Sequence, residues 1–162
     1  MKIVVTADTH TSDGKKPLPF RLKKELDDSD LIIHAGDWNS MEVYYELAEY
    51  AEVRGVYGNV DDEEIRKKFP EREIVEVAGC RIGIVHGHGE KKTTEKRAIE
   101  AFDGEKIDVL IFGHSHIPMM RYFKKILLFN PGSPTDKRRL PCYSFGILEI
   151  GEEITAKFIY FK

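Results

Sequence analysis

The sequence predicts an α/β protein in which two β-sheets pack together and helices cover their outer sides. Short apolar runs rich in β-branched residues recur along the chain, and amphipathic stretches separate the early runs. Helical patterns are missing from the end of the chain, where strand-like runs follow one another with short breaks. Alternating strands and helices are typical of parallel sheets, whereas strands joined by short breaks are typical of antiparallel ones.

The first part of the chain alternates the two kinds of element. We predict strands where short apolar runs occur, and the continuous apolar character of the first, second and sixth runs indicates strands covered on both faces. The runs are 3–5, 31–33, 53–57, 74–77, 82–85 and 109–112. We predict helices where apolar residues recur near helical spacing, at 18–26, 41–51 and 94–102.

The end of the chain is predicted to consist of strands only. Its runs are 119–123, 126–129, 142–150 and 154–161. The residues between the last two runs, Gly151-Glu152-Glu153, have the composition of a hairpin turn.

Length and composition limit the classes of protein to which the chain belongs. Its 162 residues suit one domain spanning 1–162, and 41% hydrophobic with 33% charged residues is a globular, soluble balance. No apolar run approaches the ~20 residues of a membrane span, and the first run is too short for a signal peptide, so we expect a cytoplasmic protein. A net charge of −3 argues against nucleic acid as a general partner.

Polar residues follow five of the predicted strands, at the point where each strand ends. The carboxyl ends of parallel strands gather along one edge of a sheet, where open α/β folds bind ligands. Oxygen and nitrogen ligands without a thiolate suit Mn, Fe, Ni, Co or Zn, and the lone Cys80 and Cys142 form no CxxC pattern. Seven ligands exceed the needs of one ion, so we expect two ions that share a carboxylate. The seven are Asp8, His10, Asp37, Asn59, His86, His114 and His116.

These residues lie in motifs whose order resembles that of the calcineurin-like metallophosphoesterases. The motifs are Asp8-Thr9-His10, Gly36-Asp37, Gly58-Asn59, His86-Gly87-His88 and Gly113-His114-Ser115-His116. The chain length and Asn130-Pro131-Gly132-Ser133 resemble the small single-domain phosphodiesterase branch of that family. The resemblance implies a four-layer αββα sandwich of two mixed β-sheets flanked by helices.

The resemblance also implies a division of the ligands between two divalent metal ions. Asp37 would bridge both ions, completing a first set of Asp8, His10 and His116 and a second set of Asn59, His86 and His114. Mn is the expected metal, with Ni, Fe, Co or Zn as alternatives. The implied activity is that of a phosphodiesterase in which a metal-bound hydroxide attacks a small phosphodiester.

One departure from the family concerns the leaving group. The phosphatases of the superfamily carry a histidine directly after the asparagine, where this chain has Val60, which cannot deliver a proton. The departure favours phosphodiesters or substrates with good leaving groups. His88 is the candidate catalytic acid, and Asn39 is a candidate for a hydrogen bond to the substrate.

Other polar residues are interpreted as structural. Asp61 with Glu64 has the pattern of a helix N-cap pair, and His34 fits a hydrogen-bonded histidine in the core. The run Lys137-Arg138-Arg139 would attract a phosphate but fits a solvated loop better. Trp38 suits a pocket wall and the core equally.

Two other functions remain as alternatives. A non-catalytic scaffold or binding module on the metallophosphoesterase fold is disfavoured because every histidine of the metal motifs is present. A nuclease ranks lower, since the chain has no room for a capping segment. Exposed edge strands of such a sandwich would allow a homodimer.

Overall fold

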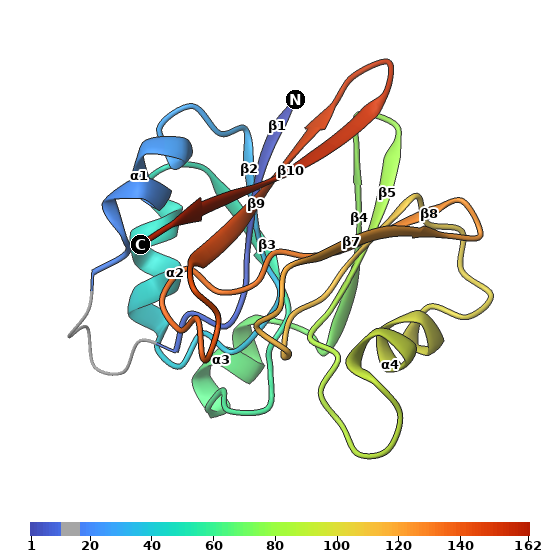
Figure 1. The fold of residues 1–162 in the computed structure, drawn as a ribbon, viewed down its shortest axis with the longest axis horizontal. Helices are drawn as coiled ribbons and strands as arrows, with labels where there is room; N and C mark the ends of the chain where they lie inside the picture. The colour runs from blue at the N-terminus through green and yellow to red at the C-terminus, as the bar shows by residue number, and fades with distance from the viewer. Residues whose placement is uncertain (11–16) are drawn as a thin grey trace.

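The computed structural model describes residues 1–10 and 17–162, and its strands form two five-stranded sheets (Figure 1). In the first sheet, β1, β2 and β3 are parallel, and β9 pairs antiparallel with both β1 and β10. Val4 lies opposite Ile32 on one side and opposite Ile147 on the other. The strand order is β10 (Ile154–Phe161), β9 (Tyr143–Ile150), β1 (Lys2–Thr6), β2 (Leu31–His34) and β3 (Glu52–Gly55).

The second sheet has a parallel centre and antiparallel edges. Strands β5, β6 and β8 run parallel, while β4 and β7 pair antiparallel with their neighbours. Both sheets are therefore mixed. The strand order is β4 (Arg72–Val77), β5 (Cys80–Val85), β6 (Val109–Ile111), β8 (Ile126–Asn130) and β7 (Met119–Phe123).

Helices cover the outer faces of the two sheets. The first sheet packs against α1 (Phe20–Leu26), α2 (Met41–Ala48) and α3 (Glu63–Lys68), and the second packs against α4 (Thr94–Ala101). Side chains cap three of these helices at their N-termini, where backbone N–H groups lack partners within the helix. The capping residues are Ser40 for α2, Asp62 for α3 and Thr93 for α4.

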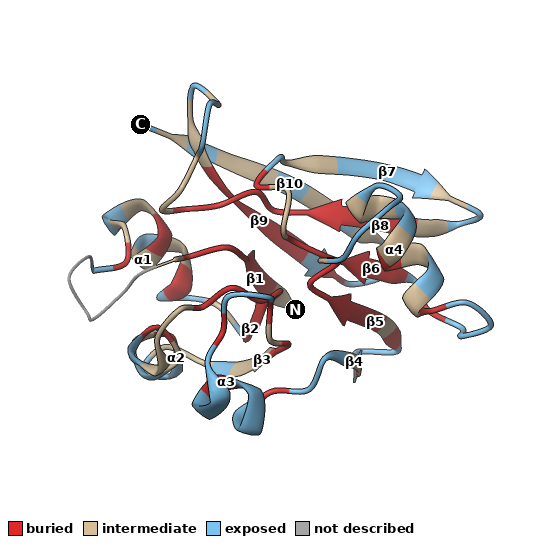
Figure 2. Ribbon diagram, turned by 90° about the horizontal axis from the view of Figure 1, so that it is seen from below, coloured by how far each residue is buried: buried red, intermediate tan, exposed pale blue. Residues whose placement is uncertain are grey.

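The alternation of side chains along the strands creates three apolar layers. In β1, Ile3 and Val5 pack between the sheets, while Val4 packs toward the helices. The same division holds in β8, where Leu127 belongs to the middle layer and Leu128 to the layer beside α4. Buried strands in the centre and half-exposed helices outside are visible in Figure 2. The predicted four-layer αββα sandwich is confirmed.

Several element boundaries differ from the predictions. α1 begins after Pro19 rather than at residue 18, and Leu18 is buried ahead of the helix. α2 ends at Ala48 rather than at 51, because the N–H of Tyr50 bonds to the carbonyl of Leu47 in a tight turn leading to β3. The sequence indicated helix α3 only through the N-cap pattern of Asp61 and Glu64, and no range was predicted for it. No helix in the described part of the chain is long and apolar enough to span a membrane.

Candidate metal centre

The seven predicted ligands lie in loops that follow the carboxyl ends of strands from both sheets. Asp8, Asp37 and Asn59 come after the neighbouring parallel strands β1, β2 and β3. His86 and the pair His114 and His116 come after the parallel strands β5 and β6 of the other sheet. Because the two sheets face each other, their loops meet at one end of the sandwich.

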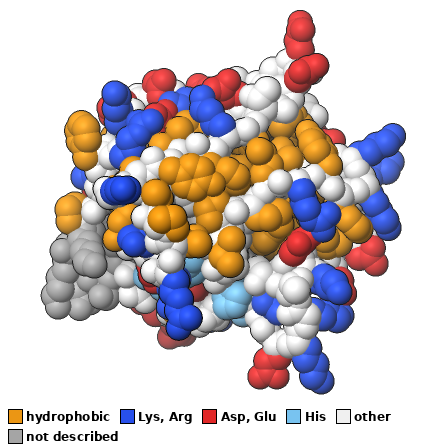
Figure 3. Space-filling model, viewed as in Figure 1, with side chains coloured by type: hydrophobic (Ala, Val, Ile, Leu, Met, Phe, Trp, Pro, Cys, Tyr) orange, Lys and Arg blue, Asp and Glu red, His pale blue; other side chains and the backbone are white. Residues whose placement is uncertain are grey.

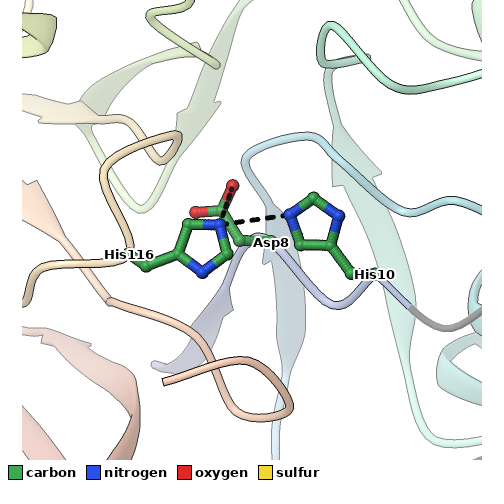
Figure 4. A group of neighbouring side chains, drawn as sticks. All are labelled: Asp8, His10 and His116. Atoms are coloured by element: carbon green, nitrogen blue, oxygen red, sulfur yellow. Dashed lines mark hydrogen bonds and ion pairs between the residues drawn. The ribbon is translucent and has the colours of Figure 1, made fainter. Parts of the chain in front are cut away.

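Asp8, His10 and His116 form the first group of potential ligands (Figure 4). One ligand atom from each lies within 4.8 Å of the others. The Nε2 atoms of the two histidines are 3.1 Å apart, and Nε2 of His116 is 3.7 Å from Oδ1 of Asp8. Two nitrogens that each lie about 2.05 Å from one ion are about 2.9 Å apart when the bonds are perpendicular. The group therefore has the dimensions of a divalent cation site.

Asp37, His86 and His114 form the second group, and Asn59 adjoins it. Ligand atoms of the first three lie within 4.8 Å of one another. Nε2 of His86 is 3.2 Å from Oδ2 of Asp37, and Oδ1 of Asn59 is 3.1 Å from Nδ1 of His114. All seven predicted ligands are thus brought into two adjacent groups.

The carboxylate of Asp37 joins the two groups. Its Oδ2 atom lies 3.2 Å from Nε2 of His86 in the second group and 3.6 Å from Nε2 of His10 in the first. Its Oδ1 atom accepts a hydrogen bond of 3.1 Å from the N–H of Val60. This is the position that a carboxylate shared by two ions requires.

Hydrogen bonds place a proton on Nδ1 of two of the histidines. Nδ1 of His86 lies 2.7 Å from the carbonyl oxygen of Ala35, and Nδ1 of His116 lies 2.7 Å from that of Asp136. A carbonyl oxygen only accepts hydrogen bonds, so each Nδ1 carries the proton and donates. In the neutral rings, Nε2 then keeps the lone pair, and this is the atom that faces the ligand group.

The backbone at the centre adopts a conformation that non-glycine residues rarely use. Five of the seven candidate ligands have a positive φ, between 43° and 66°. Such residues cost of order 1–3 kcal/mol each and cluster at functional sites. Loop contacts hold this arrangement, since the N–H of Asp8 bonds to the carbonyl of Gly36 and the N–H of His114 bonds to Oδ1 of Asp8. The five are Asp8, His10, Asp37, His114 and His116.

Burial and charge shift the pKa values in opposite directions within the centre. Burial raises the pKa of Asp8 to about 8, although the charge of His86 acts against this shift. Burial also acts to raise the pKa of Asp37, but the hydrogen-bonding and charge interactions of His86 outweigh it and lower the value to about 2. Burial, followed by repulsion from His86, lowers the pKa of His114 to about 4. The imidazole of His114 is therefore neutral near pH 7, as a metal ligand must be.

The donor set fits divalent cations. Oδ2 of Asp8 is buried, and no described residue donates a hydrogen bond to it. A buried carboxylate oxygen without a donor is costly unless a cation satisfies it. Imidazole and carboxylate donors are suited to the first-row divalent metals. Histidine side chains reach the surface in Figure 3, and His10 is only partly buried, so a ligand has access to the centre.

The two further residues predicted for chemistry lie beside the centre. The His88 ring is half-buried at a centroid distance of 5.4 Å from His86, and its Nδ1 has no hydrogen-bond partner among the described residues. Asn39 has a left-handed backbone, and its N–H donates to Asp61. Their catalytic and substrate-binding roles stay predictions.

His34 and Trp38 are core residues. The rings stack at a centroid distance of 3.7 Å, both fully buried, and Nε2 of His34 lies 3.1 Å from Oγ1 of Thr9. The prediction of a hydrogen-bonded core histidine is confirmed. Of the two positions predicted for Trp38, a pocket wall and the core, the structure shows the core, where the indole also stacks on Phe69.

The interpretation of Asp61 as a helix cap was wrong. The N-cap of α3 is Asp62, whose side chain accepts from the N–H of Ile65. Asp61 is buried and accepts from three backbone N–H groups, those of Asp37 at 2.9 Å, Asn39 at 2.9 Å and Gly58 at 2.7 Å. It therefore ties together the loops that carry Asp37 and Asn59. The only sequence feature that could have revealed this role is the pair Asp61-Asp62, because a helix needs only one of two adjacent aspartates as its N-cap.

The sandwich fold and the paired ligand groups together define an α/β protein with a candidate dinuclear metal centre at the carboxyl ends of its strands. Comparison with known proteins places the chain more narrowly. The family model of the calcineurin-like phosphoesterase superfamily domain matches residues 1–153, and the chain belongs to this family.

Individual relatives agree with this assignment. A probable metallophosphoesterase of Methanocaldococcus jannaschii is 36% identical over 160 residues, which cover 98% of this chain and 81% of the relative. Vps29 of Entamoeba histolytica complexed with zinc superposes with a TM-score of 0.75 at 22% identity, covering 100% of both chains. An archaeal phosphodiesterase has a TM-score of 0.71 at 25% identity and covers 99% of this chain and 100% of its own.

Proposed function

We propose that this protein is a metal-dependent phosphodiesterase whose two ligand groups hold two divalent ions. The observation that carries the proposal is the position of Asp37, whose Oδ2 atom faces His10 of one group and His86 of the other. A structural ion pair needs one partner, whereas a carboxylate between two sets of imidazoles suits two neighbouring cations. The similarity to an archaeal phosphodiesterase over 99% of the chain supports the proposed reaction.

Mn²⁺ is the proposed metal, and Ni, Fe, Co and Zn are the alternatives. The ligands are carboxylate, amide and imidazole groups, without a thiolate to favour the softer metals. Cys80 begins β5, whereas His86 follows the other end of that strand, so this cysteine is remote from the centre.

The chain's own residues provide position and charge. When bound, two neighbouring divalent ions would activate water and offset the charge of the phosphoryl oxygens. The carbonyls of Ala35 and Asp136 orient His86 and His116, so that each Nε2 faces inward. Asp61 fixes the loops that carry Asp37 and Asn59 relative to each other, because it accepts hydrogen bonds from the N–H groups of Asp37 and Gly58. His88 remains the proposed donor of the proton to the leaving group.

A small phosphodiester is the proposed substrate. Val60 follows Asn59, its N–H donates to Oδ1 of Asp37, and the residue is 43% exposed. Its side chain has no proton to give. Substrates with poor leaving groups lack assistance at this position. Diesters with acidic leaving groups are therefore expected to react fastest.

The test is hydrolysis of bis(p-nitrophenyl) phosphate by protein treated with a chelator and then supplied with Mn²⁺. We expect turnover that depends on Mn²⁺ and that His114→Ala lowers more than about 100-fold, beyond the 10- to 100-fold typical of residues that only orient ligands. Tyr160→Ala, which removes an exposed ring on β10, serves as the control.

Metal binding measured alongside turnover separates the outcomes. Bound Mn²⁺ without hydrolysis of any phosphodiester in a broad panel would refute the proposed activity. A folded protein that binds no divalent metal would favour the alternative of a non-catalytic scaffold or binding module on the same fold.

A further inference from the structure

Arg138 lies against the first ligand group, although its sequence context resembles a solvated loop. Its Nε atom is 3.4 Å from Nδ1 of His116, and one terminal nitrogen, Nη2, is 3.4 Å from Nε2 of the same ring. Nδ1 of His116 already donates its proton to the carbonyl of Asp136, so it has no lone pair for Arg138. The two distances place the guanidinium directly beside the His116 ring.

The loop that carries Arg138 is fastened to the centre by hydrogen bonds. Oγ of Ser133 donates to the carbonyl of Asp8 at 2.7 Å and accepts from the N–H of Asp136 at 2.8 Å. Oγ1 of Thr135 donates to the carbonyl of Thr9. The backbone of Arg138 is left-handed at φ 51°, and its N–H donates to Oδ1 of Asp136 at 3.1 Å. The position of Arg138 is therefore set by the same loop contacts that hold Asp8.

The guanidinium retains donors for a ligand. Its Nε atom pairs with Oδ2 of Asp136 at 3.1 Å. A guanidinium has five N–H donors, and four belong to the two terminal nitrogens. The Arg138 side chain is 60% exposed, and Nη2 lies beside Nε2 of His116, the ring atom that faces Asp8 and His10.

A polar cavity adjoins this guanidinium. Its volume of about 370 Å³ is within the range of small-ligand sites. The lining includes both hydroxyl and cationic groups, which are the groups that bind phosphoryl oxygens. The residues that line it are Thr9, His10, Thr135, Asp136, Lys137, Arg138 and Tyr143.

We propose that Arg138 binds the anionic oxygens of a phosphoryl group held between the cavity and the Asp8–His10–His116 group. The inference rests on the proposed phosphodiesterase function and adds a substrate-binding residue to it. An arginine fork matches two phosphoryl oxygens, and its fixed charge offsets the negative charge that increases when a diester is attacked.

The test compares Arg138→Gln with Arg139→Gln, which removes the same charge from the next, exposed residue. The affinities for Mn²⁺ and for inorganic phosphate are measured by calorimetry on each protein, and kcat and KM are measured with bis(p-nitrophenyl) phosphate. We expect Arg138→Gln to weaken phosphate binding and to lower kcat/KM by about 10- to 100-fold, the loss typical of a hydrogen bond to a charged group. Its Mn²⁺ affinity should stay within about twofold of the wild type, and Arg139→Gln should match the wild type throughout.

Arg138→Lys keeps the charge without the fork and should give an intermediate phosphate affinity, which provides a second variant if the glutamine variant does not fold. Equal phosphate affinities for the two glutamine variants would overturn the inference. A fall in Mn²⁺ affinity with unchanged phosphate affinity would also overturn it, because Arg138 would then only support His116.

A wild-type protein that binds Mn²⁺ and phosphate but hydrolyses no diester would refute the proposed function, while an Arg138-dependent phosphate affinity would still support this inference.

Discussion

At the scale of single residues, the centre depends on a carboxylate that is itself no ligand. Oδ2 of Asp61 accepts from the N–H groups of Asp37 and Gly58, and its Oδ1 accepts from the N–H of Asn39. An asparagine in its place has only one acceptor oxygen, and its NH₂ group would face a backbone N–H. A buried donor that loses its acceptor costs free energy and moves the loop that carries it.

We expect Asp61→Asn to lower the free energy of unfolding by about 1.5–3 kcal/mol and Mn²⁺ affinity by about 10- to 100-fold. Urea unfolding and calorimetry measure the two effects. The control is Asp62→Asn, which changes an exposed neighbour and leaves a side chain that caps α3 equally well. Equal Mn²⁺ affinities in the two variants would contradict the positioning role of Asp61.

The role of a residue could be predicted from the sequence only where a motif close to it in the chain indicates that role. His86 and His114 each follow an apolar strand and a recognisable motif, so their neighbourhood was predictable from pattern alone. Asp61 and Arg138 act on partners 24 and 22 residues away, and nothing near them in sequence reveals those partners. Two adjacent aspartates made the cap position ambiguous, and a run of three cations resembles many solvated loops.

At the scale of elements, the connection from β3 to α3 brings two backbones unusually close. A Cβ added to Gly58 would lie 2.0 Å from Oδ1 of Asp37 and 2.5 Å from its backbone N. Real Cβ atoms do not approach that closely, so the loop or Asp37 would have to shift. Glycine at this position is therefore a requirement of packing against Asp37.

Gly58→Ala is expected to lower the free energy of unfolding by about 1–3 kcal/mol, the usual cost of overpacking. It should also weaken Mn²⁺ binding by at least about tenfold, because Asp37 moves. Gly151→Ala in the β9–β10 turn is the control, since a Cβ there meets nothing within 4 Å. If thermal unfolding and metal titration of the two alanine variants agree, the close approach has no energetic consequence.

Element type was easier to predict than element ends. After Lys2, β1 consists of unbroken β-branched residues, and β6 consists of β-branched or large apolar ones; burial on both faces confirms that pattern. Helix α3 has only six residues and buries Ile65 alone, so it carries almost no periodic signal. The ends of α1 and α2 are set by Pro19 and by the tight turn at Tyr50, which apolar spacing does not reveal.

At the scale of the whole molecule, the centre exists only when both sheets are in place. The first ligand group takes Asp8 from the loop after β1 and His116 from the loop after β6, which belong to different sheets. The hydrogen bond from the N–H of His114 to Asp8 crosses the same junction. Folding of the sandwich and formation of the site are therefore one event, and divalent metal binding should stabilise the entire fold.

The core beneath the centre contains a histidine with no place for a second proton. Nδ1 of His34 accepts from the N–H of Gly36 at 3.2 Å, so in the neutral ring Nε2 carries the proton that is donated to Oγ1 of Thr9. Burial, followed by repulsion from His86, lowers the pKa of His34 well below its ordinary value of 6.5. Protonation of Nδ1 would break the bond to Gly36 and bury a charge.

This histidine makes the stability of the fold depend on pH. Below pH 6.5 the unfolded chain takes up a proton on His34 that the folded chain does not, so stability that is present above pH 6.5 is lost as the pH falls. Relative to His34→Gln, the free energy of unfolding of the wild type should fall by about 1.4 kcal/mol per pH unit between pH 6.5 and the lowered pKa. Urea unfolding at pH 7.5, 6.5, 5.5 and 5.0 (about the range in which histidine titrates), with chelator present throughout, measures this difference. The NMR shifts of the His34 ring supply an independent check, since they should not follow the titration of an ordinary histidine near pH 6.5. A ring that titrates near 6.5, or a difference between the two proteins that does not change with pH, would show that the folded core accepts the charged form.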